Sequence, residues 1–140
     1  MAGRARAVKP DGFATLFFDA GGVLALARRE RRAHAFLEQA RRYRAGLWTS
    51  SLTLAEVVSG RDQMAVEWTM GRLRRRAVTE ADCVRAAKLA AAAGEGTKTV
   101  NALIAAAVLK SPRPVVLLTG DPSGMRLLLA GRPGVAVIGV

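Results

Sequence analysis

Three acidic side chains and one amide stand far apart in the chain, and each of them follows an apolar run or lies beside the start of an expected helix. They are Asp19, Glu56, Asn101 and Asp121. Carboxylate oxygens are the ligands that Mg²⁺ prefers, and the ion keeps several waters, so a few carboxylates and a substrate phosphate suffice to hold it. If folding brings these side chains into one pocket, the pattern predicts a divalent-metal site.

The chemistry of such a site follows from its charges. A bound divalent ion can activate water for attack on phosphorus, and a second ion can stabilise the leaving 3′ oxygen. Without an ion the carboxylates repel one another, because two like charges about 4 Å apart cost about 4 kcal/mol at an effective dielectric of about 20. We therefore expect the metal-free pocket either to stay open or to raise the pKa of some of its carboxyl groups.

The charge of the whole chain points to an anionic partner. The 140 residues include 22 Lys and Arg against 11 Asp and Glu, which gives a net charge of +11. Nucleic acid is the first candidate partner and an acidic protein the second. No apolar run reaches the roughly 20 residues of a membrane span, so no membrane partner is expected.

The cysteine and histidine content excludes other kinds of site. Cys83 is the single cysteine and His34 the single histidine, so the chain has neither an internal disulfide nor a Cys/His set for zinc. A cytoplasmic location follows by default. Cys83 is expected to be a small core residue, and a catalytic role for His34 is not expected.

Apolar runs and helical spacing alternate along the chain. Strands are expected at 16–18, 47–49 and 115–118, with a brief extended piece at 77–78. Helices are expected at 23–44, 62–76, 79–93 and 98–110, and a further helix that begins near 50–53, carries Glu56 and ends at Gly60. A last short helix and strand follow. Thr79 and Asp82 are spaced as a capping box. This alternation predicts an α/β fold with a parallel sheet covered on both faces. Residues 1–12 are expected to be a flexible basic arm and residues 13–140 a single domain.

Four segments in this order and spacing resemble the PIN-domain family, and within it the VapC-type ribonuclease toxins of bacterial toxin-antitoxin (VapBC) pairs. The segments are Phe18–Leu24, Thr49–Val57, Val100–Ala106 and Leu117–Pro122. The resemblance implies a three-layer α/β/α sandwich with a mostly parallel central sheet. It also implies a Mg²⁺- or Mn²⁺-dependent endoribonuclease with an RNA substrate, a cognate antitoxin and a homodimeric assembly.

Carried over position by position, the resemblance implies that Asp19, Glu56 and Asp121 ligate the metal and that Thr119 assists in the pocket. Where the family usually has a further Asp, this chain has Asn101. An amide oxygen still ligates but brings no charge, so the enzyme is either a natural variant with one well-held metal or a disabled one. Asn101 could equally be a plain helix N-cap. Lys98 and Gly124 also stand where relatives often carry acidic residues, which favours natural divergence.

Arginines gather where helices are expected to begin and end, at 28–32, 41–44 and 72–76. Guanidinium forks bind phosphate bidentately, and about six contacts to a single strand would give a salt slope near −4. Arginines at a helix C-terminus also favour its dipole. Tyr43, Trp48 and Trp68 could stack on bases, although tryptophans such as Trp48 and Trp68 are more often core or interface residues.

Two other functions compete with the nuclease. A degenerate PIN module would bind RNA or an antitoxin without cutting. The segment Phe17–Val23 also looks like the first motif of haloacid-dehalogenase phosphatases, in which Asp19 would be a nucleophile. That family needs a general acid two residues later, where this chain has Gly21, and a second Asp shortly after Asp121, which is missing.

Overall fold

The computed structural model describes residues 12–57 and 62–140. Residues 1–11 of the predicted basic arm lie outside the described residues, as does Gly60, the predicted helix end. Gly12, the last residue of that arm, is buried, and a Cβ added there would lie 2.3 Å from the ring of Tyr43. No helix in the described part of the chain is long and apolar enough to span a membrane.

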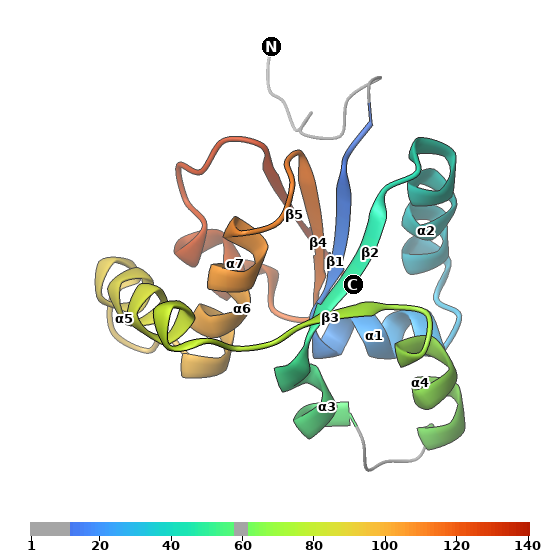
Figure 1. Ribbon diagram of the computed structural model, residues 1–140, viewed down its shortest axis with the longest axis horizontal. Coiled ribbons are helices and arrows are strands. Elements are labelled where there is room, and N and C mark those ends of the chain that lie inside the picture. Colours follow the sequence, from blue (N-terminus) through green and yellow to red (C-terminus); the bar gives the residue numbers. More distant parts are fainter. Residues whose placement is uncertain (1–11, 58–61) are drawn as a thin grey trace.

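A five-stranded sheet forms the centre of the molecule, in the order β3-β2-β1-β4-β5. Every neighbouring pair is parallel, so the expected mostly parallel sheet is confirmed and contains only parallel pairs among the described strands. The strands are β1 (Thr15–Phe18), β2 (Gly46–Ser50), β3 (Arg74–Arg76), β4 (Val115–Thr119) and β5 (Val135–Gly139). Figure 1 shows β1 and β4 at the centre of the sheet.

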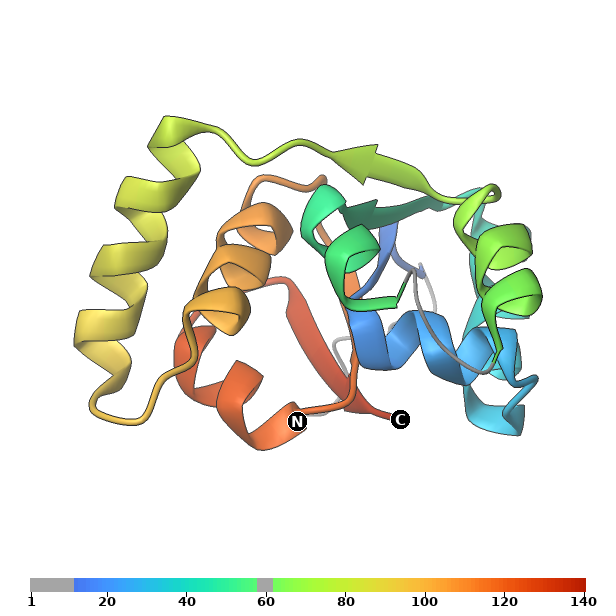
Figure 2. The ribbon, with the colours of Figure 1, turned by 90° about the horizontal axis from the view of Figure 1, so that it is seen from below.

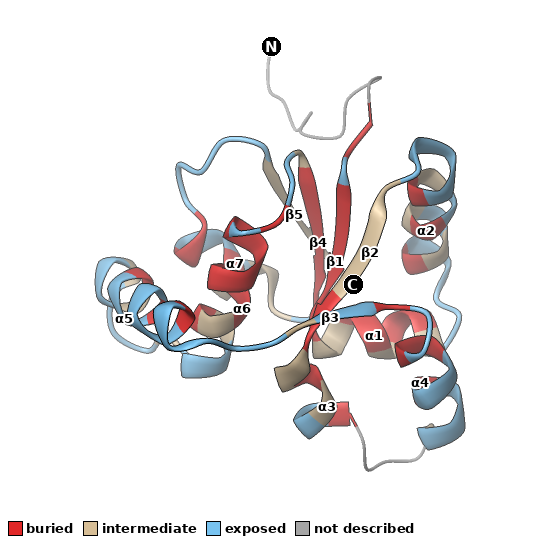
Figure 3. Ribbon diagram, viewed as in Figure 1, coloured by how far each residue is buried: buried red, intermediate tan, exposed pale blue. Residues whose placement is uncertain are grey.

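Helices cover both faces of the sheet, which confirms the three-layer α/β/α sandwich. One layer contains α1 (Ala20–Ala27), α2 (Arg31–Tyr43) and α4 (Gln63–Met70), and the other contains α5 (Glu80–Ala93), α6 (Thr99–Leu109) and α7 (Pro122–Leu128) (Figure 2). The short α3 (Ser51–Val57) follows β2. Because strand side chains alternate, Leu16 and Phe18 pack on the first layer while Phe17 packs on the second. Figure 3 shows the buried strands between the two layers.

The strand order places a topological switch point between β1 and β4. The chain runs outward from β1 to β2 and β3, and then returns to β4 on the other side of β1. Open parallel sheets bind ligands at the carboxyl ends of the two strands that flank such a point. Asp19 directly follows β1, and Asp121 lies two residues after the end of β4.

Two expected helices are wrong in extent. The helix expected at 23–44 is divided into α1 and α2, with Arg29 between them in the left-handed region at φ 58°. The helix expected at 62–76 ends at Met70, and residues 74–76 form β3 by pairing with β2, with Arg74 beside Trp48. Arginine favours helix on its own, but backbone pairing with β2 overrides that preference here.

The expected burial of Cys83 is also wrong. The Thr79–Asp82 capping box is confirmed and sets the rotation of α5 so that Asp82, Ala86 and Leu89 are its buried residues. Cys83 directly follows Asp82 in the helix and lies on its exposed side. Trp68 on α4 is 73% exposed, so it is not a core residue, and an interface or base stacking stays a prediction for it.

Candidate active site

Asp19 is held rigidly at the end of β1. Its Oδ1 accepts a 2.9 Å hydrogen bond from the backbone N–H of Gly22, which caps α1, and a 3.4 Å bond from the N–H of Gly120. Its Oδ2 accepts a 2.5 Å bond from the hydroxyl of Thr119. The residue is only 8% exposed. The carboxylate is therefore fixed by donors from both sides of the switch point.

Thr119 links the two acidic turns. Its side chain is fully buried, and while its hydroxyl donates to Asp19, the same oxygen accepts a 2.9 Å bond from the backbone N–H of Asp121. The hydroxyl therefore sets the position of Asp19 relative to the turn after β4. Because it is buried behind Asp19, Thr119 is a positioning residue.

Two glycines allow the turns after β1 and β4 to meet. A Cβ added at Gly21 would lie 2.5 Å from the backbone nitrogen of Gly120, and one added at Gly22 would lie 2.4 Å from the carbonyl oxygen of Leu118. Real Cβ atoms do not come so close to backbone. The Gly21-Gly22 pair is therefore required for Asp19 to reach the carboxyl end of β4.

Asp121 is paired with Asn101 across the pocket. The side-chain amide of Asn101 donates a 2.8 Å hydrogen bond to Oδ2 of Asp121, and the N–H of Gly124 donates a 3.1 Å bond to Oδ1. Asn101 is the third residue of α6, and the N-cap position belongs to Lys98. The interpretation of Asn101 as an N-cap is therefore wrong, and its amide instead contacts the other acidic turn.

Glu56 reaches the same pocket from α3 and is exposed. Its pKa is raised, first by partial desolvation and then by the negative charge of Asp19. Burial also raises the pKa of Asp19, and the hydrogen bonds from Thr119, Gly22, Gly120 and Gly21 only partly oppose this effect. The expected effect of one carboxylate on the pKa of another is therefore present at Glu56, whereas the pKa of Asp19 is raised by burial.

Four of the five predicted site residues, Asp19, Glu56, Asn101 and Asp121, line one pocket of about 370 Å³, and Thr119 is not among the lining residues. Asp19 comes from the end of β1, Glu56 from α3, Asn101 from the first turn of α6 and Asp121 from the turn after β4. Lys98 also lines the pocket. The convergence on which the sequence argument depended is therefore present in the structure.

Solved structures with the same fold include a chain of a toxin-antitoxin complex. A chain of a toxin-antitoxin complex from Klebsiella pneumoniae is 20% identical, with a TM-score of 0.66 over 87% of this chain and 96% of that one. A chain of VapBC2 from Rickettsia felis, solved with a promoter DNA fragment, is 14% identical, with a TM-score of 0.69 over 90% and 98%. A chain of FitAcB from Neisseria gonorrhoeae is 17% identical, with a TM-score of 0.57 over 89% and 96%.

The chain has the PIN-domain fold. No family model and no curated protein matches the sequence. At these identities the structural likeness shows the PIN fold alone, so the function must be argued from the site.

The donor chemistry of the pocket suits a hard divalent ion, although not as a preassembled triad. Mg²⁺ is held in many enzymes by one or two carboxylates together with waters and substrate phosphate. Asp19 and Glu56 supply two carboxylates close enough for the charge of Asp19 to act on Glu56. Among the described residues, however, no three Asp, Glu, His or Cys side chains lie close enough together to hold an ion.

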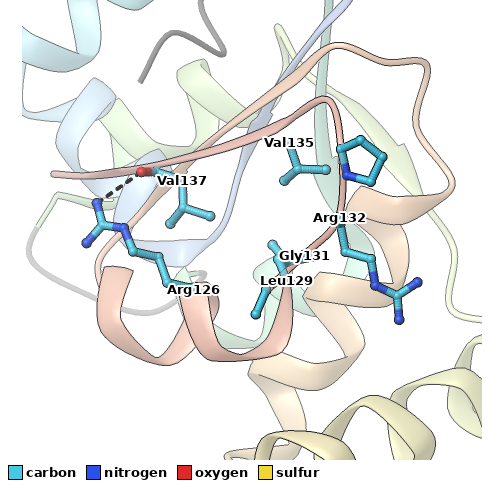
Figure 4. Close-up of a pocket in the computed structure, with 8 residues that line it drawn as sticks. Arg126, Leu129, Gly131, Arg132, Val135 and Val137 are labelled. Atoms are coloured by element: carbon cyan, nitrogen blue, oxygen red, sulfur yellow. Dashed lines mark hydrogen bonds between the residues drawn. The ribbon is translucent and has the colours of Figure 1, made fainter. Parts of the chain in front are cut away.

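Two other pockets of this PIN fold lack carboxylates. A pocket of about 400 Å³ lies between α7 and β5, where Arg126 donates a hydrogen bond to the carbonyl of Val137 (Figure 4). A pocket of about 660 Å³ between α1, α2 and α4 is lined by residues that include His34 and Trp68. Neither includes an acidic residue among the described residues that line it, so the acidic pocket remains the candidate active site.

Sequence reasoning missed the backbone donors of the site. The N–H groups of Gly22 and Gly120 both point at Asp19. The signal for them was present, because a glycine pair follows Asp19 and a glycine separates Thr119 from Asp121. Glycine is typical of close backbone approach.

Proposed function

We propose that the chain is a VapC-type toxin that cleaves RNA endonucleolytically with the help of Mg²⁺ or Mn²⁺. The observation that carries the proposal is the convergence of Asp19, Glu56, Asn101 and Asp121 on one pocket at the switch point of a PIN fold. A net charge of +11 around an acidic pocket supports a polyanionic substrate that is drawn to the protein and meets the carboxylates only at the site of reaction.

The position of each residue in the pocket suggests how it would bind the metal ion. When bound, the metal ion supplies positive charge to the phosphate oxygens and lowers the pKa of a water. Asp19, fixed by Thr119 and Gly22, would give that ion its rigid ligand. Glu56 would give a second ligand from the open side, and its exposure allows it to adjust. Asp121 would contribute the oxygens that Gly124 and Asn101 already hold in place.

The proposal includes the partners that this kind of toxin requires. One neighbour with the same fold comes from a complex described as a toxin-antitoxin complex. We accordingly propose a cognate antitoxin for this chain, a homodimeric assembly and a cytoplasmic site of action. The exposed arginines provide charge for an acidic antitoxin as well as for RNA.

One observation favours a second candidate function, a weakened or inactive PIN module that binds without cutting. Asn101 occupies one oxygen of Asp121 with a hydrogen bond that a metal ion would have to share or displace. The phosphatase alternative has no comparable support. A general acid at position 21 would collide with the backbone of Gly120, because even a Cβ there would lie 2.5 Å from its nitrogen.

A cleavage assay tests the nuclease. The wild-type chain is expected to cut single-stranded RNA in Mg²⁺ or Mn²⁺ and to stop when EDTA is added. Asp19→Asn and Glu56→Gln should each lower the rate on the order of 100-fold or more, because each removes a charged ligand of the ion whose positive charge would stabilise the transition state. Glu38→Gln, an exposed carboxylate of α2 that pairs with Arg41, is the matched control and should cut normally.

The result that contradicts the nuclease is equally clear. If wild type and Asp19→Asn release products at the same rate, the cutting comes from a contaminant. If the wild type binds RNA yet gives no products with either ion, the chain is the binding module.

A further inference from the structure

Strand register places Arg76 level with Asp19 of the acidic pocket, in one row of residues that runs across the neighbouring strands. Phe18 pairs with Thr49, so Asp19 and Ser50 each stand one residue further on, and Ser50 pairs with Arg76. Arg76 is therefore two strands away from Asp19 in one row. With neighbouring strands about 4.8 Å apart, their backbones are about 10 Å apart. The guanidinium of Arg76 lies over Trp48, which belongs to β2, the strand between them.

The same register tells which side chains share the face of the pocket. Trp48 pairs with Phe17 on one side and with Arg74 on the other, and paired residues in parallel strands point to the same face. Arg76 comes two residues after Arg74 and therefore points to the same face as Arg74. Asp19 comes two residues after Phe17 and points to the same face as Phe17. Phe17 packs against the α5–α7 layer. Arg75, between the two, belongs to the opposite face.

Trp48 holds both arginines of this face. The guanidinium carbon of Arg76 lies 4.4 Å from the centroid of the Trp48 ring, and that of Arg74 lies 5.6 Å from it. The ring of Trp48 therefore contacts two guanidinium groups, and its stacking on bases stays a prediction. A guanidinium stacked on an indole keeps its N–H edges free for bidentate bonds to phosphate.

Arg76 also has an unused donor. Its Nε is buried, and it has no hydrogen-bond partner among the residues that the structure describes. Buried donors are normally paired, but here Nε has no bond within the described residues that holds the guanidinium in place. An anion oxygen reaches Nε only when the guanidinium turns outward, and it then also meets the charge of Arg76 and of exposed Arg74.

We propose that Arg74 and Arg76, stacked on Trp48, form a phosphate subsite that binds single-stranded RNA beside the scissile bond. The subsite rests on the proposed nuclease function. Single-stranded RNA is favoured over an acidic protein because Arg76 stands level with Asp19 across the sheet and both arginines lie on the face of the pocket. A strand whose scissile phosphate lies at Asp19 therefore brings a neighbouring phosphate to Arg76.

The chain offers a matched control for this subsite. Arg75→Gln removes the same charge from the same strand but on the opposite face. All proteins carry Asp19→Asn, so that the RNA stays intact, and binding of a fluorescein-labelled oligouridine is followed by anisotropy. Arg76→Gln should weaken binding about tenfold and reduce the salt slope by about 0.7, the value of one lost phosphate contact. Arg75→Gln should leave both values close to those of the parent.

A third variant separates stacking from charge. Arg76→Lys keeps the charge but loses the planar fork, so its affinity should fall between those of Arg76→Gln and the parent. Thermal melting of each variant shows whether the fold is retained, and Arg74→Gln repeats the test if Arg76→Gln does not fold.

Four outcomes decide the inference. The expected difference between Arg75→Gln and Arg76→Gln supports it. Equal loss in the two variants would show general attraction and overturn the subsite, while the nuclease stands on its own cleavage assay. Unchanged RNA affinity with weaker binding of a polyglutamate peptide would assign the surface to a protein partner. If no variant binds RNA at all, the proposed function fails together with the subsite.

Discussion

At the acidic pocket, the amide of Asn101 takes the place of a charge. It donates a 2.8 Å hydrogen bond to Asp121, whereas an aspartate at position 101 would face Asp121 as a like charge. The pocket without metal is therefore less repulsive than a four-carboxylate pocket. The cost is a weaker hold on a cation, since affinity rises with the number of charged ligands.

Asn101→Asp is accordingly expected to bind Mn²⁺ on the order of tenfold more tightly and to cut RNA faster. In EDTA the same variant should melt at a lower temperature than wild type, because two carboxylates then face each other without an ion. Titration calorimetry with Mn²⁺ and melting curves measure the two effects.

Asn101→Ala controls for loss of the amide. It should also lose stability in EDTA, because the hydrogen bond to Asp121 is gone, but it should gain no affinity for Mn²⁺. Equal Mn²⁺ affinity and equal cleavage in wild type and Asn101→Asp would remove Asn101 from the account of the site.

Among the contacts between elements, the one between the turns after β1 and β4 leaves very little space for an added side-chain atom. The carbonyl oxygen of Leu118 would lie only 2.4 Å from a Cβ at Gly22, and both partners are fixed backbone. The turns cannot separate without moving Asp19 away from Thr119. The site and the packing of α1 on β4 therefore depend on the same glycine.

Gly22→Ala should lower the free energy of unfolding by about 1 to 3 kcal/mol through this overpacking. Gly71→Ala is the control, because Gly71 has right-handed dihedral angles and its added Cβ would be 3.4 Å from the nearest atom. That change should be neutral or stabilise by about 0.4 to 1 kcal/mol. Urea denaturation measures both, and a Gly22→Ala midpoint equal to that of wild type would refute the close contact.

The sequence predicted best those elements whose signals are local. β1 and β4 are apolar runs bounded by polar residues, and α5 begins at a capping box, so each was expected within a residue or two. β3 was missed because three consecutive arginines carry no strand signal, and only pairing with β2 makes them a strand. The split between α1 and α2 depends on one left-handed residue, Arg29, which no local preference predicts.

The candidate site was predictable in its residue types and in its convergence. Asp19 and Asp121 follow expected strands, and the parallel sheet brings the ends of β1 and β4 together. The Asn101–Asp121 hydrogen bond was not predictable, because it depends on the rotation of α6 against the turn after β4. The Trp48–Arg76 stacking depends on β3 and was missed with it.

Over the whole molecule, two buried carboxylates affect stability in opposite directions. Burial raises the pKa of Asp19. Asp82 is also desolvated, but its bonds from Lys110 and Thr79 together lower its pKa. The folded protein binds a proton at Asp19 more readily than the unfolded chain does, and it binds one at Asp82 less readily. The contribution of Asp19 to stability therefore falls as pH rises, and that of Asp82 rises.

The free energy of unfolding, measured in EDTA as a function of pH, tests these opposite contributions of Asp19 and Asp82. Asp19→Asn should be more stable than wild type at neutral pH, and the difference should vanish below the ordinary Asp pKa of 3.8, where Asp19 is protonated in both states. Asp82→Asn should be less stable than wild type at neutral pH, and this difference should shrink as pH falls through the lowered pKa of Asp82. A difference of constant size for Asp19→Asn would contradict the raised pKa.

The edge strand of three arginines also bears on how the protein behaves at high concentration. An unpaired strand at the rim of a sheet is a template on which further copies can add and build aggregates. Two β3 strands brought side by side would oppose rows of positive charge, so this rim resists self-association. Neutralising Arg74 and Arg76 together would remove that protection, and samples of such a double variant should be kept dilute.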